Sequence, residues 1–275
     1  MLLMASFTHF SRNGVVLPLE QAVISTYNIS YAYGFGVYET IRVVRGKAYF
    51  LSDHAERLMH SASIIHLVHN YTAADIEKFV TDLISTVQID AFNIKILLIG
   101  AKKPEDCELQ ILPLSPVFPE KKWYRDGVTV SSMRYERLFP QAKTLNMLGS
   151  YIAYDKARSH NAYDCLLLDH ADCITEGTRT NFFALKNRTI ISPPLEQILD
   201  GITRMHVLEV AEKNGYTIEH RSIPLSSIST FDGAFLTSTS SKVLPIRTIN
   251  DFSFDQIHPD ASELSKHFEE FLATL

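Results

Sequence analysis

Two stretches decide how this chain folds: Ala142-Lys143-Thr144-Leu145-Asn146 and Thr175-Glu176-Gly177-Thr178-Arg179-Thr180-Asn181-Phe182-Phe183. A helix-like run and an apolar strand lie between them. The lysine comes where apolar periodicity begins, and the glutamate lies in a Gly/Thr turn before a second apolar strand. We therefore expect both side chains to project from the ends of neighbouring elements into a cleft, where catalytic groups are usually carried.

The composition is that of an ordinary globular protein that acts on small molecules. The chain has 275 residues, of which 46% are hydrophobic and 21% charged, enough for one large or two modest domains. Its net charge of −5 is spread without a basic block, so neither nucleic acid nor an anionic membrane is an expected partner. The apolar opening, Met1 to Phe7, is short and lacks a preceding positive region, so we expect neither a signal peptide nor a membrane span.

The cysteines and histidines indicate no cross-link and no metal. Cys107, Cys165 and Cys173 are odd in number and show no paired spacing, which predicts free thiols in a reducing, cytoplasmic compartment. Three histidines lie close in sequence without a carboxylate to complete a ligand set, so we expect no metal site. They are His60, His66 and His69.

Strand and helix patterns mix throughout, which predicts an α/β fold of the mixed, α+β kind. The segment that begins Ser115-Pro116 is rich in proline and charge and reads as an exposed connector. We therefore expect a small N-terminal α/β domain at residues 1–114, a connector at 115–123, and a larger C-terminal domain at 124–275.

In the first domain, Asn13-Gly14 between apolar runs predicts a hairpin. Residues 37–44 alternate as a strand with Tyr38, Thr40 and Arg42 on one face. We expect two helices to follow, the first capped by Ser52 with Arg57 in its second turn, and the second capped by Thr72. Apolar strands are expected at 93–99 and 107–112.

In the second domain, the patterns predict a strand at 128–133, a helix at 146–158 and strands at 163–168 and 181–185. Gly201-Ile202-Thr203 is expected to open another helix. A strand at 235–237 then runs into a cluster of hydroxyl side chains, Thr237-Ser238-Thr239-Ser240-Ser241.

Three groups of residues suggest a chemistry. The first is Lys143 with Glu176. The second is a phosphate cradle, because a helix that opens at Ile202 and Thr203 offers backbone N–H groups and the positive end of its dipole. Arg57, Thr239 and Ser240 would add donors to the phosphate. The third is a polar and aromatic face that would line a substrate pocket, made of Tyr33, Tyr38, Thr40 and Arg42.

A lysine, a carboxylate and a phosphate cradle together suit pyridoxal 5′-phosphate (PLP). Lys143 would form the Schiff base, and Glu176 would keep the pyridine nitrogen protonated. Taken singly, each residue has an ordinary reading: a solvated lysine, a turn carboxylate, a helix arginine paired with Asp53, and a first-turn hydroxyl. Their joint order along the chain favours the cofactor site.

The same residues resemble a known family. The blocks in order are Val37-Tyr38-Glu39-Thr40-Ile41-Arg42, His54-Ala55-Glu56-Arg57-Leu58, Lys143-Thr144-Leu145-Asn146, Thr175-Glu176-Gly177-Thr178, Leu199-Asp200-Gly201-Ile202-Thr203-Arg204 and Thr237-Ser238-Thr239-Ser240. They are similar to the class IV (fold-type IV) PLP enzymes, which include branched-chain aminotransferases, D-amino-acid aminotransferases and aminodeoxychorismate lyases. The resemblance covers nearly the whole chain.

The resemblance implies a homodimer of two-domain subunits with the D-amino-acid aminotransferase-like fold and the cofactor at the domain cleft. By position it makes Lys143 the Schiff-base lysine and Glu176 the partner of the ring nitrogen. It places Arg57, Ile202, Thr203 and Thr239 at the phosphate, and Tyr38 and Arg42 toward the substrate. Leu98-Ile99-Gly100 departs from the Thr-Arg-Gly-like segment of D-amino-acid aminotransferases, which removes an arginine expected at a substrate carboxylate.

Three functions are weighed. The first is an aminotransferase that moves an amino group between an amino acid, with a branched-chain donor as one option, and a 2-oxo acid. The second is a lyase that converts 4-amino-4-deoxychorismate to 4-aminobenzoate and pyruvate. The third is a non-catalytic cofactor-binding protein, which the presence of both Lys143 and Glu176 disfavours.

Overall fold

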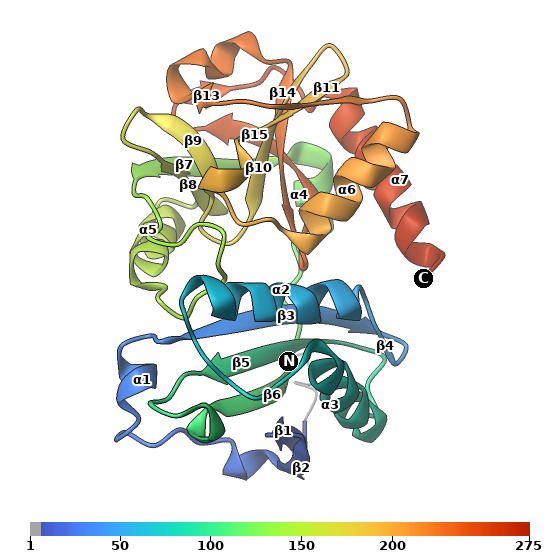
Figure 1. The fold of residues 1–275 in the computed structure, drawn as a ribbon. Helices are drawn as coiled ribbons and strands as arrows, with labels where there is room; N and C mark the ends of the chain where they lie inside the picture. Colours follow the sequence, from blue (N-terminus) through green and yellow to red (C-terminus); the bar gives the residue numbers. More distant parts are fainter. Residues whose placement is uncertain (1–6) are drawn as a thin grey trace. The chain divides into compact units, whose positions relative to one another are not determined.

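The computed structural model describes residues 7–275, and the chain divides into two compact units (Figure 1). Unit 1 comprises the described residues up to Val117 together with Ala142–Met147, which we call the lysine segment. Unit 2 comprises Phe118–Gln141 and Leu148–Leu275. The expectation about the opening stretch, Phe7 excepted, lies outside the described residues.

Unit 1 is built on a six-stranded antiparallel sheet with the order β2-β1-β6-β5-β3-β4. Its strands are β1 (His9–Arg12), β2 (Val15–Pro18), β3 (Gly36–Val44), β4 (Lys47–Ala48), β5 (Ala91–Ile99) and β6 (Glu108–Leu114). Its helices are α1 (Ile29–Ala32), α2 (Leu51–Ile64) and α3 (Ala73–Thr86), with short 3-10 turns at Leu19–Gln21 and Pro104–Asp106.

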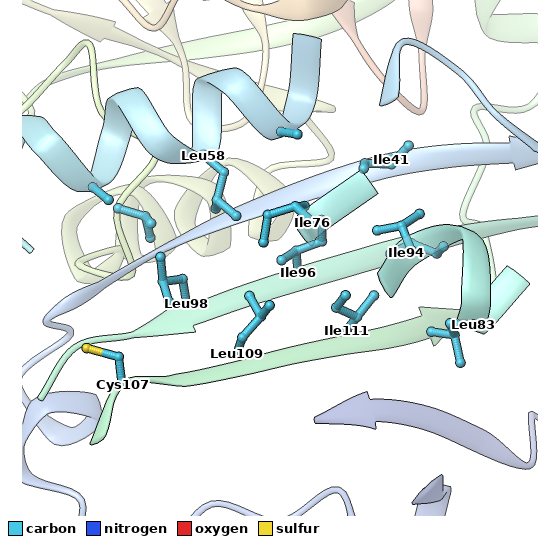
Figure 2. Close-up of a cluster of buried hydrophobic side chains, with 14 of the residues drawn as sticks. Ile41, Leu58, Ile76, Leu83, Ile94, Ile96, Leu98, Cys107, Leu109 and Ile111 are labelled. Carbon is cyan, nitrogen blue, oxygen red and sulfur yellow. The ribbon is translucent and has the colours of Figure 1, made fainter. Parts of the chain in front are cut away.

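One face of this sheet carries the core of unit 1. Ile41 of β3, Ile96 of β5 and Ile111 of β6 point toward Leu58 of α2 and Ile76 of α3 (Figure 2). Side chains alternate between the two faces of a strand. The residues that alternate with the core positions of β3 therefore lie on the opposite face of the sheet, as the burial pattern of β3 shows. They are Tyr38, Thr40 and Arg42.

Unit 2 contains the larger sheet, whose order is β12-β11-β10-β14-β15-β7-β8-β9-β13. A further pairing between Glu176 and Asn181 joins β9 to β10, so the strands from β10 through β14, β15, β7 and β8 to β9 are paired in a closed ring. The strands are β7 (Val128–Arg134), β8 (Asp164–Leu168), β9 (Cys173–Gly177), β10 (Asn181–Lys186), β11 (Thr189–Ser192), β12 (Thr217–His220), β13 (Ile223–Pro224), β14 (Gly233–Ser238), β15 (Lys242–Ile249) and β16 (Phe252–Ser253).

Four α-helices accompany the sheet of unit 2: α4 (Lys121–Asp126), α5 (Leu148–Ser159), α6 (Ile202–Lys213) and α7 (Pro259–Ala273). Short 3-10 segments lie at Leu195–Gln197 and Leu225–Thr230. Phe182, Leu236 and Leu244 are among the buried residues that form its core. The mixed α/β architecture predicted from the sequence is confirmed, and none of the described helices has the length and apolar character to cross a bilayer.

Local predictions have mixed outcomes. The hairpin at Asn13-Gly14 and the Thr72 cap of α3, which forms a capping box with Asp75, are confirmed. The Ser52 cap is wrong, because α2 begins at Leu51 and its N-cap residue is Phe50, in the left-handed conformation.

The domain division also differs from the expected one. The lysine segment belongs to unit 1, because its backbone pairs with β3, and such pairing leaves no pattern in the sequence. In addition, α4 begins inside the expected connector.

Candidate active site

The backbone of Lys143 is held on the edge of β3. The N–H of Tyr38 donates to Lys143 O at 2.9 Å, and the N–H of Leu145 donates to Gly36 O at 2.8 Å. The N–H of Lys143 itself donates to Ser61 Oγ of α2 at 3.1 Å. The lysine therefore extends the sheet of unit 1, and the helix expected at 146–158 begins at residue 148.

The side chain of Lys143 reaches the outer face of β3. Its Nζ lies 4.7 Å from the centre of the Tyr38 ring, and Tyr38 Oη donates to Met147 Sδ at 3.6 Å. A second amine, Lys95 Nζ of β5, lies 5.5 Å from the centre of the same ring. The structure thus brings the expected catalytic lysine onto the strand face that was expected to meet the substrate.

That face continues along β3 with polar and cationic groups. Thr40 pairs with Lys95, and Arg42 pairs with Asn93, in the β3–β5 register, so each pair shares a face. Tyr33 lies apart from them, because it ends α1 and its side chain is 81% exposed. Within unit 1, the strand residues of the predicted pocket are together and Tyr33 is not packed among them.

Arg57 lies on α2, as expected, and its guanidinium makes two contacts with one carboxylate. Arg57 Nε donates to Glu39 Oε1 and Nη2 donates to Glu39 Oε2, both at 2.7 Å. Two parallel N–H···O bonds to one carboxylate fix the plane of the guanidinium.

Glu176 lies in β9 and not in a turn, because the strand continues to Gly177. The residue is 4% exposed, and its carboxylate has two partners in unit 2. Arg137 Nη1 donates to Oε1 at 2.7 Å, and the backbone N–H of Leu199 donates to Oε2 at 3.1 Å. The arginine and the backbone N–H therefore fix the orientation of this carboxylate within unit 2.

The turn after Glu176 is held by a second buried carboxylate, that of Asp164. Thr178 Oγ1 donates to Asp164 Oδ1, and Thr180 Oγ1 donates to Oδ2 at 2.8 Å. The N–H of Cys165 adds a third donor at 2.8 Å. Burial raises the pKa of Asp164 even though these donors act against it. The hydroxyls of the Gly/Thr turn thus bind the protein itself.

Asn181 connects Glu176 with the start of α6. It pairs with Glu176 and with Thr237 across the sheet, and its Nδ2 donates to Leu199 O at 2.8 Å. A Cβ on Gly201 would overlap Asn181 Oδ1, so a larger residue there would have to displace the Asn181 amide. The ring-nitrogen candidate and the phosphate candidate of unit 2 therefore form one connected cluster.

The N-terminus of α6 is open toward an anion. Gly201 is its N-cap residue, no side chain caps the helix, and Ile202 and Thr203 in the first turn are buried. An uncapped helix start with glycine before it is a common phosphate site. Thr239 and Ser240 lie in the turn after β14, which Ser238 and Ser241 close through their hydroxyls at 2.7 Å.

These groups fit PLP. Unit 1, by itself, has an amine at Lys143 on a polar strand face. Unit 2, by itself, has the Glu176 carboxylate bonded to Arg137 and an uncapped helix start. Each is a group of the kind that the cofactor needs. The sequence expectations missed Arg137, which lies six positions before the lysine in an irregular stretch. No pattern in the sequence around Arg137 indicated a role for it.

Comparison with known proteins identifies the family. A family model described as "Amino-transferase class IV" matches residues 36–249, well over half of the chain. The chain therefore belongs to the class IV aminotransferases. It is an enzyme of amino-group transfer whose cofactor is PLP, as expected from the residues, and the lyase and non-catalytic readings are not favoured.

Relatives and solved structures agree with this assignment. The chain is 28% identical over 249 residues to a D-alanine aminotransferase of Bacillus licheniformis, covering 86% of this chain and 87% of the relative. It is 27% identical to a D-alanine aminotransferase of Staphylococcus aureus (strain N315), covering 94% and 96%.

The fold is that of the branched-chain aminotransferases. The enzyme of Thermoproteus uzoniensis, solved with norvaline, matches with a TM-score of 0.88 at 24% identity, covering 97% of this chain and 95% of that one. A branched-chain enzyme of Escherichia coli matches with a TM-score of 0.85 at 21% identity, covering 95% and 93%.

Proposed function

We propose that this enzyme transfers an amino group from an amino acid to a 2-oxo acid with Lys143 as its catalytic residue. Glu176 pairs with the cofactor's ring nitrogen. Lys143 holds the cofactor and later moves the proton. The phosphate is bound by Arg57, Ile202, Thr203, Thr239 and Ser240, and the substrate lies against Tyr38, Thr40 and Arg42.

The observation that carries this proposal is the place of the Lys143 amine above Tyr38. The backbone of the lysine is fixed by β3 and Ser61, so its amine meets the face that also bears Arg42 and Lys95. Cations on this face would bind the carboxylate of an amino acid, and its Cα would then lie beside Lys143, the base that removes the Cα proton.

The bound cofactor supplies an electron sink for the carbanion at the amino acid's Cα. Lys143 Nζ would take the proton from the Cα of the amino acid and give it back later in the cycle, so one amine would serve both proton transfers. Glu176, oriented by Arg137, would accept the N–H of the ring nitrogen. The hydroxyl and guanidinium groups at the phosphate keep the cofactor in place during exchange of substrates.

Substrate handedness is proposed from the relatives. Both relatives described above are named D-alanine aminotransferases, which favours a D-amino acid as donor. The branched-chain donor expected from the sequence stays a prediction, because the solved branched-chain enzymes are too distant to carry substrate choice.

A panel of four donors tests both the reaction and the donor. The purified holoenzyme is mixed separately with D-alanine, L-alanine, D-leucine and L-leucine while the visible absorbance of the cofactor is followed. We expect D-alanine to convert the cofactor to its amine form and pyruvate to reverse the change. A response to L-leucine alone would overturn the D-donor proposal, and release of pyruvate from aminodeoxychorismate without an acceptor would replace transfer by lysis.

We further propose a homodimer in the cytoplasm. Exposed apolar side chains gather in residues 27–33 of unit 1, where Tyr27 is 92% and Ile29 is 62% exposed, and such clusters favour an interface between subunits. All three cysteines are free and buried, in keeping with a reducing compartment. Light scattering on the eluting holoenzyme would give the mass of two chains if this is right and of one chain if it is not.

A further inference from the structure

Glu39 is a charged residue on the core face of β3. Its neighbours on that face, Val37 and Ile41, are fully buried and apolar, and Glu39 is itself 0% exposed. Burying a carboxylate is costly unless charged or hydrogen-bonding partners surround it. Packing alone therefore does not explain why a glutamate occupies this position in an apolar layer.

Two residues of α2, one turn apart, surround this carboxylate. Arg57 binds both oxygens through Nε and Nη2, and His54 Nδ1 lies 2.7 Å from Oε2. Burial would raise the pKa of Glu39, but Arg57 and His54 beside it hold that pKa well below its usual range. Burial also lowers the pKa of His54, so the imidazole is neutral at pH 7. Because a carboxylate only accepts, Nδ1 of this imidazole carries the proton.

The same face of α2 also holds the backbone of Lys143. His54, Arg57 and Ser61 recur at helical spacing, and Ser61 Oγ accepts the N–H of Lys143. One helix face thus orients both the catalytic lysine and an arginine whose guanidinium plane Glu39 fixes. An arginine that is free to rotate loses side-chain conformational entropy when it binds an anion, whereas an arginine already fixed in position loses less.

We propose that Glu39 and His54 are positioning residues for the cofactor phosphate, with Glu39 orienting the Arg57 guanidinium and His54 holding the Glu39 carboxylate. The proposal rests on the function above, in which Arg57 contacts the phosphate. It predicts a loss specific to the phosphate, whereas a purely structural role of the three residues would weaken every form of the cofactor alike.

Two ligands separate these readings. PLP and 5-deoxypyridoxal, which keeps the ring and aldehyde and lacks the phosphate, are titrated into the apoprotein, and the visible absorbance gives a Kd for each. In His54→Leu the Kd for PLP rises by about tenfold, as for the loss of one hydrogen bond to a charged group, and that for 5-deoxypyridoxal changes by less than about twofold. Equal losses for both ligands would overturn the proposal.

Conservative variants give a second, independent readout. Asparagine places its amide nitrogen near the position of Nδ1, so His54→Asn restores PLP binding, whereas His54→Gln, whose nitrogen falls near Nε2, does not. If His54→Leu fails to fold, this pair still decides, because equal PLP affinities in the two variants would overturn the proposal. Leu58→Ala, a fully buried apolar neighbour on α2, serves as the matched control and lowers the melting temperature without changing the ratio of the two Kd values.

Failure of the proposed function would look different. In that case the wild-type protein itself would show no cofactor absorbance with either ligand. Tight PLP binding by the wild type with unchanged PLP binding by His54→Leu would leave the function standing and overturn the positioning role alone.

Discussion

Arg137 and Glu176 form a largely buried ion pair with 2.7 Å between Nη1 and Oε1, in which the Arg137 side chain is 17% and the Glu176 side chain 5% exposed. The pair lies in unit 2, where Glu176 also accepts the N–H of Leu199. Removing one partner of such a pair leaves an uncompensated charge, which costs more than the pair itself contributes.

Arg137→Met should therefore lower the free energy of unfolding by about 3 kcal/mol, measured by urea denaturation. Glu176→Gln should be milder, since its amide still accepts from Leu199. The double variant should be more stable than the sum of the two losses implies, by about 1 to 3 kcal/mol. Strict additivity would show that the two side chains do not interact in solution.

Ser61→Ala should weaken both the fold and amino transfer, because the N–H of Lys143 loses its acceptor. An unpaired buried N–H costs about 1 to 3 kcal/mol of unfolding free energy. Ser63→Ala is the matched control, since Ser63 binds only an exposed carbonyl at the end of α2 and its loss should stay within about 0.5 kcal/mol. Equal effects of the two changes would contradict the proposed anchoring.

Gly201→Ala should destabilise unit 2 by about 1 to 3 kcal/mol and weaken PLP binding, because the new Cβ must displace the Asn181 side chain. Gly46 offers a contrast: its φ is +74° and nothing lies within 4 Å of a Cβ there. Gly46→Ala should cost about 1 kcal/mol through backbone strain and leave the Kd for PLP unchanged. Thermal unfolding with and without PLP separates the two effects.

Acid should destabilise the wild type in part through His54. Burial lowers the pKa of His54 in the folded state from 6.5, and the nearby charges of Arg57 and Lys143 lower it further. Glu39 acts in the opposite direction. The stability that His54 contributes is therefore complete above pH 6.5 and is lost as the pH falls toward the lower folded pKa. His54→Asn should lose less unfolding free energy than wild type between about pH 7.5 and pH 5.5. Parallel losses would mean that His54 is not buried in its neutral form.

Periodicity and turn chemistry predicted much of the local structure. The alternation in β3, the Asn13-Gly14 hairpin and the Thr72 capping box are local in sequence, so a short window contains the whole cause. The start of α6 after Gly201 was predicted for the same reason.

The site was harder to predict because its parts are joined by contacts between distant residues. Lys143 lies on an edge of β3 through hydrogen bonds to residues about a hundred positions away, and no window around it shows this. Glu176 was expected in a turn because of its Gly and Thr neighbours, but Thr178 and Thr180 bind Asp164. Arg137 gave no pattern at all. Residue types and order thus indicated the chemistry, and tertiary hydrogen bonds decided the geometry.

The lysine segment returns to unit 1 after the chain has already entered unit 2, which has a practical consequence for anyone who dissects this protein. A fragment cut after residue 117 would lack the backbone that covers Gly36 and Tyr38 on β3. Its exposed strand edge would invite self-association. A fragment that ends at residue 117 would therefore be prone to aggregate and would lack Lys143. A synthetic peptide spanning residues 142–147 is the segment to add in trans to cover that strand edge.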